Sequence, residues 1–220
     1  MYTKEELKSL EIVPKISKIS LKTIAEFYCD NLTKKSFKYK IRLHKSKDEI
    51  EIDIRFFTEN LPHLLGIQKV AAEGQRYKYE GKLGYEGMIR ESITIKSLKD
   101  LDKGLRPNNR SERVFPKIES RITYFYLLPQ LMEKCNIVKF NNNTVTQLFN
   151  GNCNIKSDFI LYHEKLGVKL HLGVVKEQNG KVYYVPQTFI VKSIRARDRD
   201  RLTSGQRFAN IVERTIENID

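Results

Sequence analysis

The sequence predicts an α+β protein with a helical N-terminal part that contains a β-hairpin, then an antiparallel sheet of four or more strands, and finally a C-terminal helix. Three observations support this prediction. Apolar residues recur at helical spacing early in the chain, apolar and polar residues alternate over residues 36–57, and several short β-rich runs follow one another within residues 137–194. Because strands and helices do not alternate, we expect helices gathered on one side of an antiparallel sheet.

The helix expected after Ser20 is amphipathic. Ser20 can accept a hydrogen bond from the first turn as its N-cap. Apolar residues then recur three, four and seven positions apart, at Leu21, Ile24, Ala25, Tyr28 and Leu32. This spacing places them on one face of the helix, which we expect to be buried.

A β-hairpin is predicted over residues 36–57. Phe37–His44 and Ile50–Phe57 each alternate apolar and polar residues with a period of two, and a short polar segment separates them. Asn60 then offers a cap for a short helix in which Pro62 occupies the first turn. The pattern indicates a hairpin with one solvent-exposed face, followed by a short helix.

The middle of the chain is less regular. Residues 74–87 are rich in glycine and indicate a flexible loop, residues 88–101 indicate a mixed helical segment, and residues 104–113 indicate a basic loop. Helical spacing continues from Ile118 to Cys135 on both sides of Pro129, which predicts a kinked helix or two consecutive short ones.

The sequence pattern of the C-terminal half is typical of a β-sheet. Short β-rich runs occupy residues 137–140, 159–162, 168–175, 181–185 and 188–191, with a turn at 178–180. A C-terminal helix is then expected from the apolar residues Phe208, Ile211, Val212 and Ile216. No linker or internal repeat divides the chain, so we expect a single domain over residues 1–220.

The chain is strongly basic. Its 40 Lys and Arg residues outnumber its 27 Asp and Glu residues, which gives a net charge of +13. This charge favours binding to a polyanion, with RNA or single-stranded nucleic acid as the leading partner. The alternative is a cationic surface that serves solubility.

Residues 74–87 have the composition of a nucleic-acid footprint. Basic residues for phosphate contact alternate with aromatic residues for base stacking: Arg76, Lys78 and Lys82 with Tyr77, Tyr79 and Tyr85. The alternative is a plain solvated loop. A second basic segment, residues 192–201, is weaker because Asp198 and Asp200 partly neutralise its arginines.

Several classes of protein are disfavoured. The apolar runs are too short to span a membrane and the N-terminus has no signal-peptide pattern, so a cytoplasmic location is expected. The three cysteines suggest neither disulfides nor a zinc site, and we expect them to pack as small apolar residues. Phosphate-binding loops, dinucleotide fingerprints, zinc-peptidase motifs and serine-hydrolase motifs are missing, and Glu51 and Asp53 alternate on an exposed strand rather than converging. We therefore expect no cofactor and no metal.

The remaining candidates suit metal-independent RNA cleavage, which needs a base, an acid and cations that hold the phosphate. His63 lies near a predicted helix N-terminus, where an anion is favoured, although it could equally be a capping or core-edge residue. His171 could contact nucleic acid or be a solvated strand residue, and His44 and His163 are expected to be ordinary surface residues. Thr188 could donate to a phosphate or simply suit a strand.

Four segments together resemble a nuclease family of phages and mobile elements, the fourth subtype of a group named for barnase, EndoU, colicins and RelE and commonly called the BECR fold. They begin at Phe56, Arg121, Lys156 and Tyr183, and the first, Phe-Phe-Thr-Glu-Asn-Leu-Pro-His-Leu-Leu-Gly-Ile, is the most specific. The resemblance spans roughly residues 15–215. It implies a helical part followed by a four-stranded antiparallel sheet, with metal-independent RNA cleavage as a toxin or effector. Family members often carry Ser where this chain has Thr188.

The resemblance implies a set of site residues. His63 is expected as general base or acid, Arg121 or Lys156 as the cation that stabilises the transition state, and Asp158 either as a catalytic group or as the partner of a neighbouring cation. Thr188 and Gln187 are expected to donate to phosphate, and His63 and Thr188 to lie on one concave surface. The residues expected to bind nucleic acid are Arg76, Tyr77, Lys78, Tyr79, Lys82, His171 and Gln187.

One alternative from another class stays open. The same fold could be an inactive module that binds nucleic acid or a protein, such as an inhibitor of a host defence system. The hydroxyl crowded by a methyl in Thr188 slightly favours this module, whereas the intact segment around His63 favours the nuclease.

Overall fold

A computed structural model describes residues 1–107, 110–150, 153–177, 181–194 and 200–219. The chain forms two compact units. Unit 1 comprises Met1–Thr33 and Phe57–Leu128, and unit 2 comprises Lys34–Phe56 and Pro129–Asp220. The predicted turn at 178–180 and positions 195–199 of the second basic segment lie outside the described residues.

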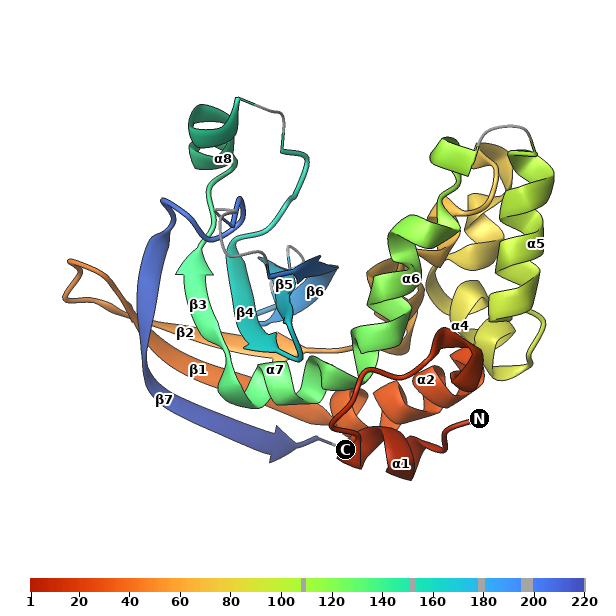
Figure 1. The fold of residues 1–220 in the computed structure, drawn as a ribbon. Helices are drawn as coiled ribbons and strands as arrows, with labels where there is room; N and C mark the ends of the chain where they lie inside the picture. Colours follow the sequence, from red (N-terminus) through yellow and green to blue (C-terminus); the bar gives the residue numbers. More distant parts are fainter. Residues whose placement is uncertain (108–109, 151–152, 178–180, 195–199, 220) are drawn as a thin grey trace. The chain divides into compact units, whose positions relative to one another are not determined.

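Unit 1 is helical. Its α-helices are α1 (Lys4–Ser9), α2 (Leu21–Tyr28), α3 (Leu61–Leu65), α4 (Gly81–Ile89), α5 (Ile95–Leu105) and α6 (Phe115–Tyr124), joined by short 3-10 turns that include η5 (Glu73–Tyr79) (Figure 1). The predicted N-cap of α2 is confirmed, since the Ser20 side chain accepts a hydrogen bond from the Thr23 N–H at 2.9 Å. Asn60 occupies the N-cap position of α3, as predicted, but its carboxamide accepts from the Phe57 N–H rather than from the first turn of the helix.

A buried carboxylate connects two helices of unit 1. Asp102 on α5 is 1% exposed and accepts hydrogen bonds from the Val114 and Phe115 N–H groups, at 3.1 and 2.8 Å, where α6 begins. Arg106 pairs with the same carboxylate at 2.7 Å. Since the first N–H groups of a helix have no partner within the helix, Asp102 satisfies two of them and fixes the start of α6 against α5.

Unit 2 is built on a closed sheet of seven described strands. They are β1 (Lys35–Leu43), β2 (Glu49–Arg55), β3 (Asn136–Lys139), β4 (Phe159–Lys165), β5 (Val168–Lys176), β6 (Tyr184–Ser193) and β7 (Arg207–Asn218). Their order around the barrel is β1-β2-β6-β5-β4-β3-β7, and β7 returns to β1 (Figure 1). Neighbouring strands are antiparallel except β2 and β6, which meet in parallel at Ile54 and Tyr184.

The predicted hairpin and antiparallel sheet are confirmed. Strand β1 pairs with β2, and β3 to β6 pair in sequence order, all antiparallel. The end of the run predicted at 181–185 and the run at 188–191 belong to one strand, β6, which begins at Tyr184. The register with β5 shifts between Gly173 and Val174, which leaves Gln187 as the extra residue of a β-bulge. Helix α7 (Leu128–Lys134) follows α6 and a 3-10 turn, as expected for consecutive short helices around Pro129.

One face of the sheet in unit 2 is covered by elements that the sequence did not indicate. Helix α8 (Asn142–Phe149) and the turn at 200–206 place Val145 and Leu202 in a small apolar cluster with Val138, Phe140 and Ile160. Register places Tyr162, His171, Gly173 and Thr188 on this same face, because Tyr162 pairs with His171 and Gly173 pairs with Thr188.

The predicted C-terminal helix is wrong, because the last element is strand β7. A shift in register with β1 leaves Val212 as an extra residue: Ile41 pairs with Ile211, whereas Lys40 pairs with Glu213. The bulge breaks the alternation, so that Phe208, Ile211, Val212 and Ile216 acquire a spacing that imitates a helix.

The flexible loop predicted at 74–87 is also wrong, because these residues form η5 and the first part of α4. Two glycines explain the helix. A Cβ on Gly84 would lie 2.7 Å from the backbone of Tyr79, and one on Gly87 would lie 2.6 Å from the side chain of Ile93. The glycines allow close packing, which outweighs their low helix propensity.

Candidate functional site

His63 lies on α3 with its side chain exposed, and a buried residue holds its ring. The side-chain nitrogen of Gln68, a residue 4% exposed, lies 2.8 Å from Nδ1 of His63. In this arrangement the amide donates to Nδ1, so the neutral imidazole carries its proton on Nε2. Oε1 of Gln68 is buried and has no hydrogen-bond partner among the described residues.

Three cations gather in the same region of unit 1. Partial desolvation, followed by the positive charges of Arg121 and Arg76, lowers the pKa of Lys69, which follows Gln68 in the chain. Burial lowers the pKa of Arg121, whose Nη1 donates to the Leu64 carbonyl of α3 at 3.4 Å. None of the described carboxylates forms an ion pair with these three side chains. An anion bound here would relieve their mutual repulsion.

The end of α3 sets the position of this cluster. Gly66 closes the helix in the left-handed region with φ of 76° and donates its N–H to the Pro62 and His63 carbonyls. A Cβ at Gly66 would lie 3.2 Å from Ile118 and 3.5 Å from Nη1 of Arg121. The glycine therefore lets α3 end sharply while Arg121 of α6 approaches its backbone.

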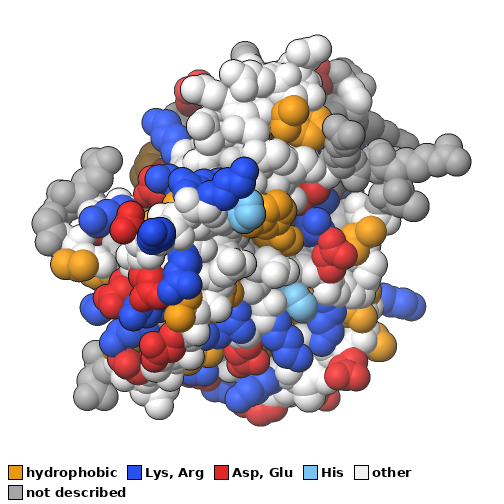
Figure 2. Space-filling model, turned by 90° about the vertical axis from the view of Figure 1, so that its left-hand side faces the viewer, with side chains coloured by type: hydrophobic (Ala, Val, Ile, Leu, Met, Phe, Trp, Pro, Cys, Tyr) orange, Lys and Arg blue, Asp and Glu red, His pale blue; other side chains and the backbone are white. Residues whose placement is uncertain are grey.

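The residues predicted as a nucleic-acid footprint are accessible. The side chains of Arg76, Tyr77 and Lys78 on η5 and of Lys82 on α4 are exposed, and Tyr79 is half-buried. The Lys78 ammonium lies 5.8 Å from the centre of the Tyr77 ring. Since Arg76 also lowers the pKa of Lys69, this footprint adjoins the cluster around His63. Elsewhere basic and acidic side chains are interspersed, as on the face in Figure 2.

Thr188, one of the predicted site residues of unit 2, lies on the covered face of the sheet. Thr188 on β6 is half-buried, and its methyl Cγ2 would lie 2.8 Å from a Cβ on Gly173. The Ser157 Oγ would lie 2.3 Å from the same Cβ. Gly173 therefore leaves room for a hydroxyl residue on each side, and Ser157 is a neighbour of Thr188 that the sequence did not single out.

Lys156 and Asp158 line a cavity of about 670 Å³ beside this pair. The Lys156 side chain is exposed. Asp158 accepts a hydrogen bond from the Lys176 N–H at 2.7 Å, so its carboxylate holds a backbone rather than a neighbouring cation. Gln187 is half-buried at the bulge of β6.

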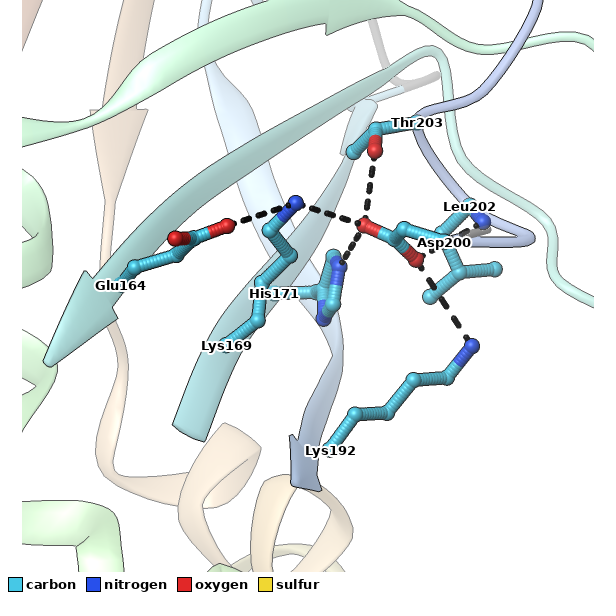
Figure 3. A network of polar contacts seen from close by, with 7 residues as sticks. All are labelled: Glu164, Lys169, His171, Lys192, Asp200, Leu202 and Thr203. Carbon is cyan, nitrogen blue, oxygen red and sulfur yellow. Dashed lines mark hydrogen bonds and ion pairs between the residues drawn. The ribbon is translucent and has the colours of Figure 1, made fainter. Parts of the chain in front are cut away.

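His171 belongs to a polar network whose centre is Asp200 (Figure 3). The side chain is 1% exposed, which excludes the alternative of a solvated strand residue. Its Nε2 lies 2.7 Å from the Asp200 carboxylate, which also accepts from the Thr203 hydroxyl and the Leu202 N–H and pairs with Lys169 and Lys192. Contact between His171 and a nucleic acid, as predicted, would require the turn at Asp200 to open.

The network also explains the ionisation of Asp200. Burial alone would raise the pKa of this carboxyl, but the hydrogen bond and charge of His171, together with the donors Thr203 and Leu202, hold it well below its usual range. Asp200 connects a turn to strands β5 and β6. Its neutralisation of neighbouring arginines stays a prediction, because Arg197 and Arg199 lie outside the described residues.

Within each unit, the structure brings some predicted residues together. In unit 1, Arg121 donates to the carbonyl of Leu64, the residue that follows His63 on α3. In unit 2, Lys156 and Asp158 line one cavity, and Thr188 adjoins Ser157. The arrangement of His63 and Thr188 on one surface stays a prediction. The sequence did not point to Gln68, Lys69 or Ser157, although Gln68 and Lys69 follow the most specific segment directly.

The described part of the chain contains no group of three or more His, Cys, Asp or Glu side chains arranged to hold a metal ion. Among the same residues, no helix combines the length and the apolar character needed to cross a bilayer.

Comparison with known protein families identifies the class to which the chain belongs. Residues 20–220 match the family described as phage-Barnase-EndoU-ColicinE5/D-RelE like nuclease4. The chain belongs to this family, and the resemblance inferred from its four segments is confirmed. Neither a curated protein nor a solved structure matches the chain.

Proposed function

We propose that the protein is a metal-independent endoribonuclease in which His63 transfers a proton. The observation that carries this proposal is the exposed imidazole of His63, held by the buried Gln68 beside Lys69, Arg76 and Arg121. Membership of a nuclease family supports a nucleic-acid substrate. RNA is the substrate class that needs no metal, because its own 2′-hydroxyl can serve as the nucleophile.

The Gln68 amide suits a histidine that must change its protonation state. With the amide nitrogen toward Nδ1, neutral His63 carries its proton on Nε2 and can only donate from that atom. Rotation of the amide by half a turn brings the unpartnered Oε1 of Gln68 to Nδ1, which then carries the proton and donates it to Oε1, so that Nε2 can accept the proton of the 2′-hydroxyl. Once Nε2 is protonated, Nδ1 keeps its hydrogen bond to Oε1, and the same amide orientation holds the ring until Nε2 gives the proton to the leaving 5′-oxygen.

The cations supply the second requirement of the reaction. Cleavage concentrates negative charge on the non-bridging oxygens of the phosphate, and preorganised cations stabilise that charge more in the transition state than in the ground state. Arg121 remains protonated and is anchored on the Leu64 carbonyl, which suits it to this role. The roles of Thr188, Gln187, Lys156 and Asp158 in the same reaction remain part of the proposal.

The test is cleavage of a single-stranded RNA by the purified protein in EDTA. We expect products that end in a 2′,3′-cyclic phosphate, because attack by the 2′-hydroxyl leaves that group. His63→Ala should lower the rate by about 10²–10⁴-fold, the usual contribution of one acid–base group. His44→Ala provides a matched control, since His44 is an exposed histidine in unit 2.

The outcomes separate the two classes of function. Equal rates for His63→Ala and His44→Ala would remove His63 from the reaction. Binding of RNA by the wild-type protein with no cleavage in either EDTA or magnesium would favour the inactive binding module.

A further inference from the structure

The cavity beside Lys156 has the electrostatics of an anion site. It is formed within unit 2 by the end of β3, the start of α8, the segment before β4, the end of β5 and the turn into β7. Four of its lining residues are basic: Lys139, Lys156, Lys176 and Arg207. Across the described ranges, none of the four forms an ion pair. Asp158 also lines the cavity, but its carboxylate already accepts from a backbone N–H.

Two residues that line the cavity have a buried polar atom without a hydrogen-bond partner among the described residues. The Ser157 hydroxyl oxygen and Oδ1 of Asn142 are buried, and neither has a hydrogen-bond partner in the part of the chain that is described. Both residues line the cavity. A buried polar atom without a partner is destabilising, and of these two atoms the Ser157 hydroxyl can donate a hydrogen bond, so it points to a ligand that accepts one.

Hydrogen bonds hold the part of the cavity wall that Asn141 and Gln206 form. Gln206 donates its amide to the Asn141 carbonyl at 3.1 Å and accepts from the Asn141 N–H at 2.8 Å, which joins the turn to α8. The Asp200 network fixes the other end of the same turn through Thr203 and Leu202 (Figure 3). The cavity therefore has a preformed shape, which lowers the entropic cost of binding.

We propose that this cavity binds a backbone phosphate of single-stranded RNA. The three lysines and Arg207 neutralise the phosphate, and the Ser157 hydroxyl donates to one of its oxygens. RNA fits better than a free anion because the four cations line an open, wide cavity rather than close around a single ion. The inference deepens the proposed function, on which it rests, by assigning a phosphate subsite to unit 2.

The experiment measures binding of a fluorescent single-stranded RNA oligonucleotide to full-length His63→Ala protein, so that cleavage does not interfere. Lys139, Lys156 and Lys176 are all exposed, and changing them together to Gln should weaken binding by about 10- to 100-fold and reduce the salt slope by about 2. The matched control changes the exposed Lys8, Lys47 and Lys117 to Gln, which removes the same charge. Equal losses in the two triple variants would overturn the proposal.

Ser157→Ala tests the site without a change of charge. Removing an unpartnered buried hydroxyl should leave the thermal midpoint unchanged or slightly raised, whereas removing a hydrogen bond to a phosphate should weaken RNA binding by about 10-fold. Loss of both stability and binding would indicate a structural role and count against the subsite.

Inorganic phosphate distinguishes the source of the ligand. We expect it to compete with RNA, relative to chloride of equal ionic strength, in the His63→Ala protein and not in the lysine variant. Phosphate binding that depends on the three lysines, combined with RNA binding that does not, would overturn the assignment to RNA. If instead wild-type protein binds RNA through the cavity but does not cleave it, the proposed function fails and the subsite stands.

Discussion

Nε2 of His171 lies 2.7 Å from Oδ2 of Asp200, and this contact ties the turn before β7 to the covered face of the sheet. The histidine is buried and its Nδ1 has no partner within the described residues, so the carboxylate supplies its hydrogen bond. A paired and partly buried carboxylate is costly to disturb, because removing one partner leaves the other polar group unsatisfied.

Asp200→Asn should lower the free energy of unfolding by about 2–3 kcal/mol at pH 7. The loss should depend on pH, because the pKa of Asp200 is lower in the folded than in the unfolded protein. The stabilisation from the carboxylate is fully present above its unfolded pKa of about 4 and disappears as pH falls through the lower folded value. Urea unfolding of both proteins from pH 7 to pH 3 measures the difference.

Glu164→Gln is the control for this prediction. Glu164 pairs with Lys169 in the same network, but its side chain is 54% exposed. Exposed ion pairs contribute little, so the expected loss is below about 1 kcal/mol. A loss for Asp200→Asn that is no larger, or that stays constant down to pH 3, would contradict the account of the network.

Gln68 should act as a positioning residue for His63. Gln68→Leu keeps the approximate size but removes the hydrogen bond to Nδ1, and misplacement of the ring should slow RNA cleavage by about 10- to 100-fold. Gln68→Glu instead presents an acceptor that favours protonated His63, so the limb of the pH–rate profile that reports His63 should move to higher pH. A profile for Gln68→Glu that coincides with that of wild type would argue against contact between the two side chains in solution.

The exposed cations of η5 and α4 should contribute to RNA affinity by neutralising phosphates. Changing Arg76, Lys78 and Lys82 to Ala together should weaken binding, and on single-stranded RNA the salt slope should fall by roughly 0.7 for each phosphate that is no longer neutralised. Fluorescence anisotropy at several salt concentrations gives both quantities. Because Arg76 adjoins the cluster around His63, an affinity and slope equal to those of wild type would separate the footprint from the proposed site.

The alternation of apolar and polar side chains predicted the hairpin, in which the pairing of β1 with β2 has no bulge. It failed for strand β7, whose pairing with β1 contains one. Strands β1 and β2 alternate cleanly, with Phe37, Tyr39 and Ile41 buried, and the hairpin was predictable. In strand β7, Ala209, Ile211, Arg214 and Ile216 pair with the buried apolar residues of β1, and the extra residue Val212 shifts the phase between Ile211 and Arg214. A bulge depends on pairing with β1, which is far away in sequence, so local periodicity could not reveal it.

The sequence proposed His63 as a candidate because it stands in the most specific segment. It did not single out Gln68 and Lys69, although they follow His63 within six residues, because neither belongs to a recognisable motif. The cavity in unit 2 was not predictable, because Lys139, Lys176 and Arg207 come from three different strands. Likewise, the contact between His171 and Asp200 spans 29 positions, and only the folded sheet brings the two residues together.

The three cysteines should differ sharply in reactivity. Cys135 is 4% exposed, and burial raises the pKa of its thiol to about 11, whereas Cys29 and Cys153 are half-buried. The thiolate is the reactive form, so at pH 8 only about one in a thousand Cys135 thiols is ionised. The Cys29→Ser, Cys153→Ser double variant should therefore react with a thiol-specific disulfide reagent slowly when folded and rapidly in urea. Rapid reaction of the folded variant would show that Cys135 is accessible.

Gly66→Ala should destabilise unit 1 and disturb the cluster around His63. Gly66 has a φ of 76°, and an added Cβ would lie 3.2 Å from Ile118 and 3.5 Å from Nη1 of Arg121, so backbone strain and crowding add together. We expect a loss of about 1–2 kcal/mol in urea unfolding. Gly74→Ala is the control, because a Cβ there meets no atom within 4 Å and its φ is not positive, and it should be neutral or slightly stabilising. Equal stability of the two variants would mean that α3 can end without a left-handed residue, and the close approach of Arg121 to its last turn would then need another explanation.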